Sequence, residues 1–112
     1  NDPLLLGEES PLLVLKYGTI MLGVMDELPM LKVGEIKVPP RTLLLTYTDG
    51  LTEVFDADHN EFGEEGVLRV LRRNRYAPLP TVHRELLRDI EAFNASPTGF
   101  ADDITILSCR FK

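Results

Sequence analysis

The chain has 112 residues, of which 44% are hydrophobic and 27% are charged, and its formal net charge is −6. This composition is ordinary for one globular domain, and the absence of a long uncharged apolar run excludes a membrane span. The excess of acid disfavours nucleic-acid binding, which needs clustered Lys and Arg. The one cysteine, Cys109, leaves no intrachain disulfide and favours a reducing, cytoplasmic location.

The first half of the chain has the pattern of β-strands. Short apolar runs at 4–6 and 12–17, separated by a polar loop, predict a hairpin. The segment 30–38 alternates imperfectly and predicts an exposed strand. Pro39-Pro40 then predicts a turn, because neither residue has an N–H for a ladder. The next strand, 43–47, begins with three leucines, so we expect it to be buried on both faces.

After residue 50 the hydrophobic period changes from two to about 3.6, which is typical of helices. A first helix is predicted from Gly63, with acids in its first turn and arginines in its last. A second helix opens at Pro80, and one stripe of it is expected to be buried: Val82, Leu86, Leu87, Ile90 and Phe93. A last strand, 104–111, contains Cys109, which we expect to be buried. This order predicts an α+β fold, with helices covering one face of a mostly antiparallel sheet.

Two acidic turns border predicted core strands. Asp49-Gly50 ends the strand 43–47, and Asp102-Asp103 precedes the strand 104–111. Each turn alone is more typical of an ordinary turn or a solvated strand start. If the two strands are neighbours, however, the carboxylates converge at one end of the sheet. Carboxylate oxygens are the ligands that Mg²⁺ and Mn²⁺ prefer, so the pair predicts a metal site formed by Asp49 and Asp102.

The motifs TYTDGLTE and DDITIL are separated by EFGEEGVLRVLRRN and a second amphipathic helix. Together they resemble the C-terminal part of the SpoIIE/RsbU-type metal-dependent protein serine/threonine phosphatases, the bacterial branch of the type-2C superfamily. The resemblance runs from about Gly23 to the end of the chain. It implies an α-β-β-α sandwich of two antiparallel sheets. Residues 1–112 would then be a single truncated phosphatase-like domain that lacks the N-terminal strands.

The resemblance also implies roles for individual residues. Asp49 and Asp102 would be the catalytic, metal-binding aspartates, Gly50 would let the backbone approach the metal, and Asp103 would support the site. Two Mn²⁺ or Mg²⁺ ions would activate a water to hydrolyse phosphoserine or phosphothreonine in a regulatory phosphoprotein. Such hydrolysis serves bacterial signalling, with sigma-factor control and an anti-sigma-factor antagonist as one candidate role and substrate.

The chain departs from the family pattern before Asp49. Relatives supply a further aspartate beside a glycine from an N-terminal strand, whereas Asp2 here precedes Pro3 and Asp26 precedes Glu27. We therefore expect these residues alone to be poorly active. The alternative is a non-catalytic regulatory or assembly module on the same scaffold. The apolar sheet face left without a partner also predicts that the chain forms a homodimer.

Two further patterns have simpler interpretations. The segment Asp56-Ala57-Asp58-His59-Asn60 is similar to the start of a calcium-binding EF-hand loop. That loop needs Gly at its sixth position and a bidentate Glu at its twelfth, where this chain has Glu61 and Val67.

A run of arginines, at 69, 72, 73 and 75, fits a solvated helix face better than a phosphate-recognition patch.

Overall fold

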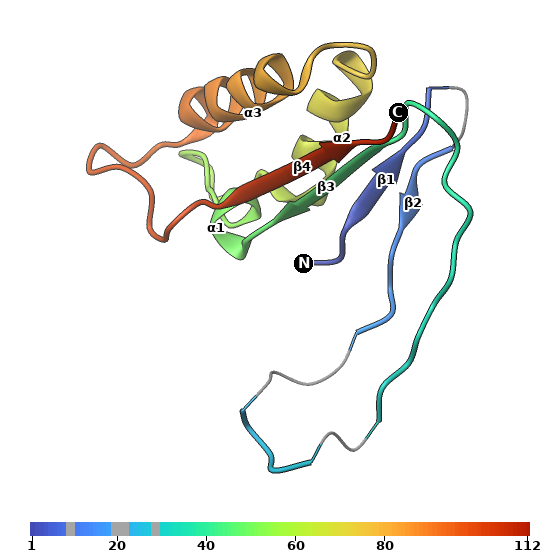
Figure 1. Ribbon diagram of the computed structural model, residues 1–112. Coiled ribbons are helices and arrows are strands. Elements are labelled where there is room, and N and C mark those ends of the chain that lie inside the picture. Colours follow the sequence, from blue (N-terminus) through green and yellow to red (C-terminus); the bar gives the residue numbers. More distant parts are fainter. Residues whose placement is uncertain (9–10, 19–22, 28–29) are drawn as a thin grey trace.

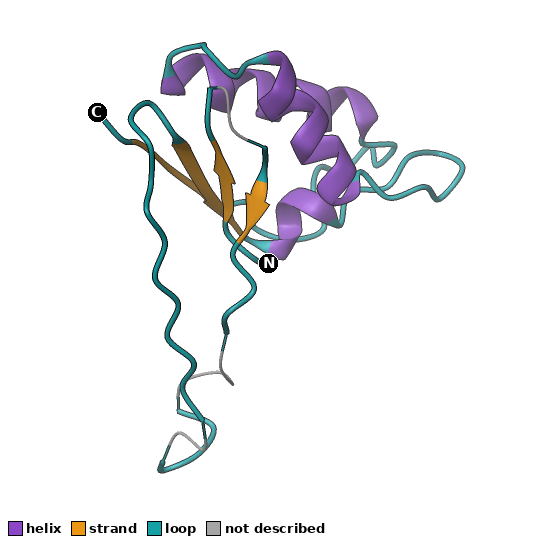
Figure 2. Cartoon of the chain, turned by 90° about the vertical axis from the view of Figure 1, so that its right-hand side faces the viewer, coloured by secondary structure: helices purple, strands orange, loops and turns teal. Residues whose placement is uncertain are grey.

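The computed structural model describes residues 1–8, 11–18, 23–27 and 30–112. Within them lie four strands: β1 (Leu4–Leu6), β2 (Leu13–Val14), β3 (Leu43–Tyr47) and β4 (Ile106–Arg110). The helices are α1 (Asp49–Thr52), α2 (Gly63–Arg73) and α3 (Leu79–Phe93). The strands pair antiparallel in the order β2-β1-β3-β4. The helices lie on one face of this sheet, so the predicted α+β class is confirmed (Figures 1 and 2).

The sheet register determines which leucines form the core. Leu45 pairs with Leu4 and Leu43 pairs with Leu6, and all four side chains are buried. They lie in the cluster of buried side chains that includes the apolar residues of α2 and α3. The intervening Leu44 is only half-buried, because it belongs to the opposite face of the sheet. The expectation that β3 is buried on both faces is therefore only partly correct: the face toward the helices is buried, and the opposite face is half-buried.

Both long helices bury the side that their hydrophobic period predicts. In α3 the residues Val82, Leu86 and Ile90 recur every fourth position and are fully buried. Leu87 is 41% exposed, which corrects the expectation that it belongs to the buried stripe. One residue advances the helix by about 100°, so Leu87 lies on the flank of that stripe.

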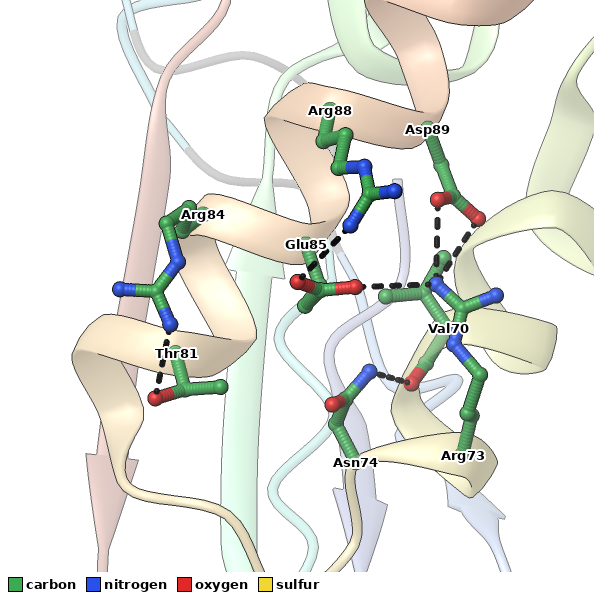
Figure 3. A network of polar contacts seen from close by, with 8 residues as sticks. All are labelled: Val70, Arg73, Asn74, Thr81, Arg84, Glu85, Arg88 and Asp89. Carbon is green, nitrogen blue, oxygen red and sulfur yellow. Dashed lines mark hydrogen bonds and ion pairs between the residues drawn. The ribbon is translucent and has the colours of Figure 1, made fainter.

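A polar network joins the end of α2 to α3 on the solvent side (Figure 3). Arg73 Nη2 donates to both carboxylate oxygens of Asp89, at 3.0 and 3.1 Å, and lies 3.5 Å from Glu85 Oε2. The hydrogen bonds and the charge of Asp89, together with the charge of Glu85, raise the pKa of the Arg73 guanidinium. Arg73 is thus engaged in holding the helix pair together, which agrees with a solvated face at this end of α2.

Several strand expectations need correction. No strand forms in the described segment 30–38, although its residues 36–38 line a pocket together with Leu5 of β1 and Leu13 of β2. The predicted hairpin is confirmed, but β2 contains only Leu13 and Val14. β4 is an edge strand of the described sheet, whereas the sequence predicted that 104–111 would be a core strand. Cys109 lies on the face of β4 away from the helices and is therefore exposed, not buried.

None of the helices in the described part of the chain is long and apolar enough to cross a membrane.

Candidate functional site

Asp49 occupies a fixed position just beyond the end of β3. Thr48 has extended backbone angles, φ −86° and ψ 163°, and Asp49 is the first residue of α1. The carbonyl of Asp49 accepts hydrogen bonds from the N–H of Glu53 at 2.8 Å and from the hydroxyl of Thr52 at 3.1 Å. Leu51 is fully buried and anchors this short helix to the core. The tight turn expected at Asp49-Gly50 is therefore a single turn of helix.

The segment that leads into β4 lies directly against α1. Thr48 connects the two: its N–H donates to the Thr105 carbonyl at 3.1 Å, and its hydroxyl accepts from the Thr105 N–H at 2.9 Å. The same hydroxyl donates to the Asp103 carbonyl at 3.1 Å. The main chains of the two acidic segments, Asp49-Gly50 and Asp102-Asp103, thus meet at one end of the sheet.

The two candidate carboxylates are both accessible to solvent. The Asp49 side chain is 63% exposed, and its Oδ1 lies 3.6 Å from the amino group of Asn1. Asp102 is exposed as well, and its Oδ1 accepts a hydrogen bond from the Asp103 N–H at 2.8 Å. Carboxylates that keep oxygen lone pairs open to solvent are of the right kind for a hard divalent cation.

The described residues bring together fewer ligands than a metal centre needs. Among the residues that the structure describes, no group of three or more His, Cys, Asp or Glu side chains is placed to hold a metal ion. Asp49 and Asp102 therefore supply part of a donor set. Metal binding by Asp49 and Asp102 stays a prediction, as do the supporting roles of Gly50 and Asp103.

Tyr47 is a residue at this end of the sheet that the sequence did not single out. It is the last residue of β3, only 8% of its surface is exposed, and its hydroxyl has no hydrogen-bond partner among the residues that the structure describes. Burial, followed by the negative charges of Glu64, Asp2 and Asp49, raises the pKa of Tyr47 to about 12. The phenol is therefore neutral at physiological pH and lies in an acidic environment. Its only signal in the sequence is its position two residues before Asp49.

The loop that is similar to an EF-hand uses its first carboxylate internally. Asp56 Oδ1 accepts from the N–H groups of Asp58 at 2.9 Å and Asn60 at 2.8 Å, and Asp56 Oδ2 accepts from Asn60 Nδ2 at 2.9 Å. The bonds from Asn60 in particular lower the pKa of Asp56. This carboxylate stabilises its own turn, which agrees with the rejection of a calcium loop.

Comparison with known proteins identifies one family. The model of the family described as Stage II sporulation protein E (SpoIIE) matches residues 1–112, which include both acidic segments. Comparisons with curated proteins and with solved structures gave no match.

Proposed function

The chain belongs to the SpoIIE family, and on this premise we propose that it is part of a metal-dependent phosphatase that hydrolyses phosphoserine or phosphothreonine in a regulatory protein. The observation that carries the proposal is the meeting of the Asp49 and Asp102 segments at one end of the sheet. We further propose a cytoplasmic role in bacterial signalling, with sigma-factor control and an anti-sigma-factor antagonist as the first role and substrate to test.

Asp49 and Asp102 would bind Mn²⁺ or Mg²⁺ in this phosphatase. When bound, such cations lower the pKa of a coordinated water and neutralise charge on the phosphoryl oxygens. The remaining residues position the two aspartates. α1 fixes the main chain of Asp49, Thr48 ties it to the Asp103 carbonyl, and the small size of Gly50 permits the close approach of the two segments.

The incomplete donor set leads to a second part of the proposal. Two carboxylates hold a dinuclear site weakly, because each cation prefers six or more oxygen ligands, of which protein carboxylates supply only some. Family resemblance implies a further aspartate beside a glycine, and residues 1–112 contain no such motif in the expected place. We propose that polypeptide outside these residues supplies it, and that the 112 residues alone hydrolyse phosphate esters poorly.

The test is metal-dependent turnover of a phosphoserine peptide by the full-length protein. In metalloenzymes, loss of a residue that only hydrogen-bonds to a metal ligand lowers metal affinity or activity by about 10–100-fold. Loss of a metal ligand itself should cost more, so Asp49→Ala and Asp102→Ala should each lower the turnover by at least about 100-fold. The matched control is Asp58→Ala, because Asp58 is an exposed aspartate whose carboxylate makes no hydrogen bond or ion pair with a described residue. Full activity in either site variant would refute the assignment.

A non-catalytic regulatory or assembly module is the second candidate function. The observation that favours it is the lack of a three-ligand group among the described residues. The two candidates differ in two results. A non-catalytic module would bind its partner protein unchanged after Asp49→Ala, and its full-length wild type would show no metal-dependent turnover.

We also propose that the 112-residue chain forms a homodimer through the sheet face away from the helices. Leu107 on this face is 68% exposed and Leu13 is 42% exposed, while Leu44 of β3, on the same face, is half-buried. Burying apolar surface contributes roughly 25 cal/mol per Å², and identical patches are self-complementary about a two-fold axis. A second copy of the same sheet is therefore the occupant that fits this face.

A further inference from the structure

A groove of about 560 Å³ lies next to the two acidic segments. One wall is formed by the loop that comes after α1 in the chain, and the other by the loop that comes after α3. The lining residues include Glu53, at the end of α1, and Ala101, immediately before Asp102. The groove is therefore adjacent in the chain to both Asp49 and Asp102. A peptide held at those aspartates has this groove as a neighbouring surface.

Hydrogen bonds within and between the two loops hold the groove walls in place. The Ala95 N–H donates to the Phe55 carbonyl at 3.1 Å, which joins one wall to the other. Asn94 closes its own loop, because its Nδ2 donates to the Gly99 carbonyl at 3.1 Å and its Oδ1 accepts from the Ser96 N–H at 3.0 Å. The shape of the groove is thus maintained without a ligand.

The groove combines two aromatic rings with an unengaged carboxylate. Phe55 is 47% exposed and Phe100 is 37% exposed, and both line the groove. Glu53 is exposed, and its carboxylate makes no hydrogen bond or ion pair with any residue that the structure describes. The other acid in the lining, Asp56, is already occupied by its own loop. Glu53 is therefore the lining carboxylate that is open to a cationic partner.

Arginine and lysine match this surface better than other side chains do. Their aliphatic stems pack on apolar surface while their charged heads remain available for a carboxylate. Arginine in particular stacks on aromatic faces and binds carboxylates in a forked geometry. The unengaged carboxylate of Glu53 and the formal net charge of −6 favour a positively charged partner, whereas an acidic peptide would be repelled.

We propose that this groove binds an arginine or lysine side chain of the phosphoprotein substrate, in the segment that flanks the phosphorylated residue. That the ligand is a phosphoprotein substrate rests on the proposed phosphatase function. The preference for a cationic side chain rests on Glu53, Phe55 and Phe100. The groove is thus a specificity-determining site beside the metal-binding aspartates.

The test is an NMR titration of the protein with an unphosphorylated heptapeptide, Ala-Arg-Arg-Ala-Ser-Val-Ala, and with the same peptide carrying Gln in place of both Arg. The arginine peptide should shift the amide resonances of Phe55 and Phe100 and bind more tightly than the glutamine peptide. Glu53→Gln should weaken binding of the arginine peptide by about 1.4- to 5-fold, the range of exposed ion pairs of 0.2–1 kcal/mol, and leave the glutamine peptide unaffected. Phe100→Ala should weaken it as well.

The matched control is Glu65→Gln, which removes the same charge from an exposed position of α2 that does not line the groove. Equal binding of both peptides, or equal weakening by Glu53→Gln and Glu65→Gln, would overturn the groove proposal. Full-length protein that hydrolyses the phosphoserine forms of both peptides with equal kcat/KM would also overturn the groove and leave the phosphatase function standing. Selective binding of the arginine peptide without any phosphatase turnover would support the groove chemistry and contradict the phosphatase function.

Discussion

Gly50 lies so close to the main chain of Asp103 that no side chain fits between them. A Cβ placed on Gly50 would be 2.5 Å from the Asp103 carbonyl oxygen and 3.0 Å from its carbonyl carbon. Gly50 has no unusual backbone angle, so glycine is needed here for space alone. This contact is where the turn after β3 and the segment before β4 are held together.

Gly50→Ala should therefore destabilise the protein by about 1–3 kcal/mol, because the clash is with main-chain atoms that cannot move aside cheaply. The measurement is urea unfolding. Gly18→Ala is the control, since a Cβ at Gly18 would meet nothing within 4 Å and Gly18 has no positive φ. Equal unfolding midpoints for the two variants would contradict the close approach.

Leu86 and Leu87 give a second comparison within one helix. Leu86 is fully buried, whereas Leu87 is 41% exposed. Leu86→Ala should cost about 2–5 kcal/mol through lost burial and a residual cavity, and Leu87→Ala should cost less than about 1 kcal/mol. Thermal or urea unfolding measures both. A larger loss of stability for Leu87→Ala would indicate that Leu87 is buried, as the sequence predicted.

Tyr47 should make stability fall at high pH. Its pKa is about 12 in the folded protein, against about 10 in an unfolded chain. Because the folded state holds this proton more tightly, the contribution is fully present below pH 10 and is lost as the pH rises from about 10 to about 12. It amounts to roughly 2–3 kcal/mol.

Tyr47→Phe should remove that part of the pH dependence and change stability little at pH 7, since the hydroxyl has no partner to lose in the described part of the chain. Urea unfolding at several pH values between 8 and 12 would compare it with wild type, and the difference between the two curves isolates Tyr47. Tyr17→Phe is the control, because Tyr17 is 68% exposed. A Tyr47→Phe curve parallel to that of wild type would show that the phenol titrates normally.

The proposed homodimer is tested by sedimentation at micromolar concentration. Wild type should have twice the mass of the 12.6 kDa chain. Leu107→Lys should yield monomers, because it places a charge in the apolar sheet face. Leu87→Lys, a matched change at an exposed leucine of α3, should leave the dimer intact. A monomeric wild type, or dissociation by both variants alike, would contradict an interface on this face.

The sequence predicted most reliably what local periodicity determines. The stripe Val82, Leu86 and Ile90 follows from a 3.6-residue period, and both α2 and α3 are found where that period places them. Alternation in 30–38 indicated an extended backbone but contained no information on whether a partner strand is present. The exposure of Cys109 likewise depends on its lying on the sheet face that the helices leave uncovered, which only the strand pairing reveals.

In the candidate site, too, the sequence predicted local features but not those that depend on distant parts of the chain. The acidic turns were visible as Asp49-Gly50 and Asp102-Asp103 because each borders a strand. The acidic environment of the Tyr47 hydroxyl was not visible, since it includes Glu64 and Asp2 from distant parts of the chain. The groove beside Glu53 requires two loops about forty residues apart to lie together, and no local pattern reports that arrangement.

Whether Asp49 and Asp102 bind the same cation is tested most directly by titrating Mn²⁺ into the ¹⁵N-labelled protein. Paramagnetic Mn²⁺ broadens the resonances of nearby amides, so even weak binding is located. We expect Gly50 and Asp103 to broaden together at the lowest Mn²⁺ concentrations, and either Asp49→Asn or Asp102→Asn to remove the broadening at both. Broadening centred on the loop 56–60, or broadening at Gly50 that survives Asp102→Asn, would contradict a shared metal site.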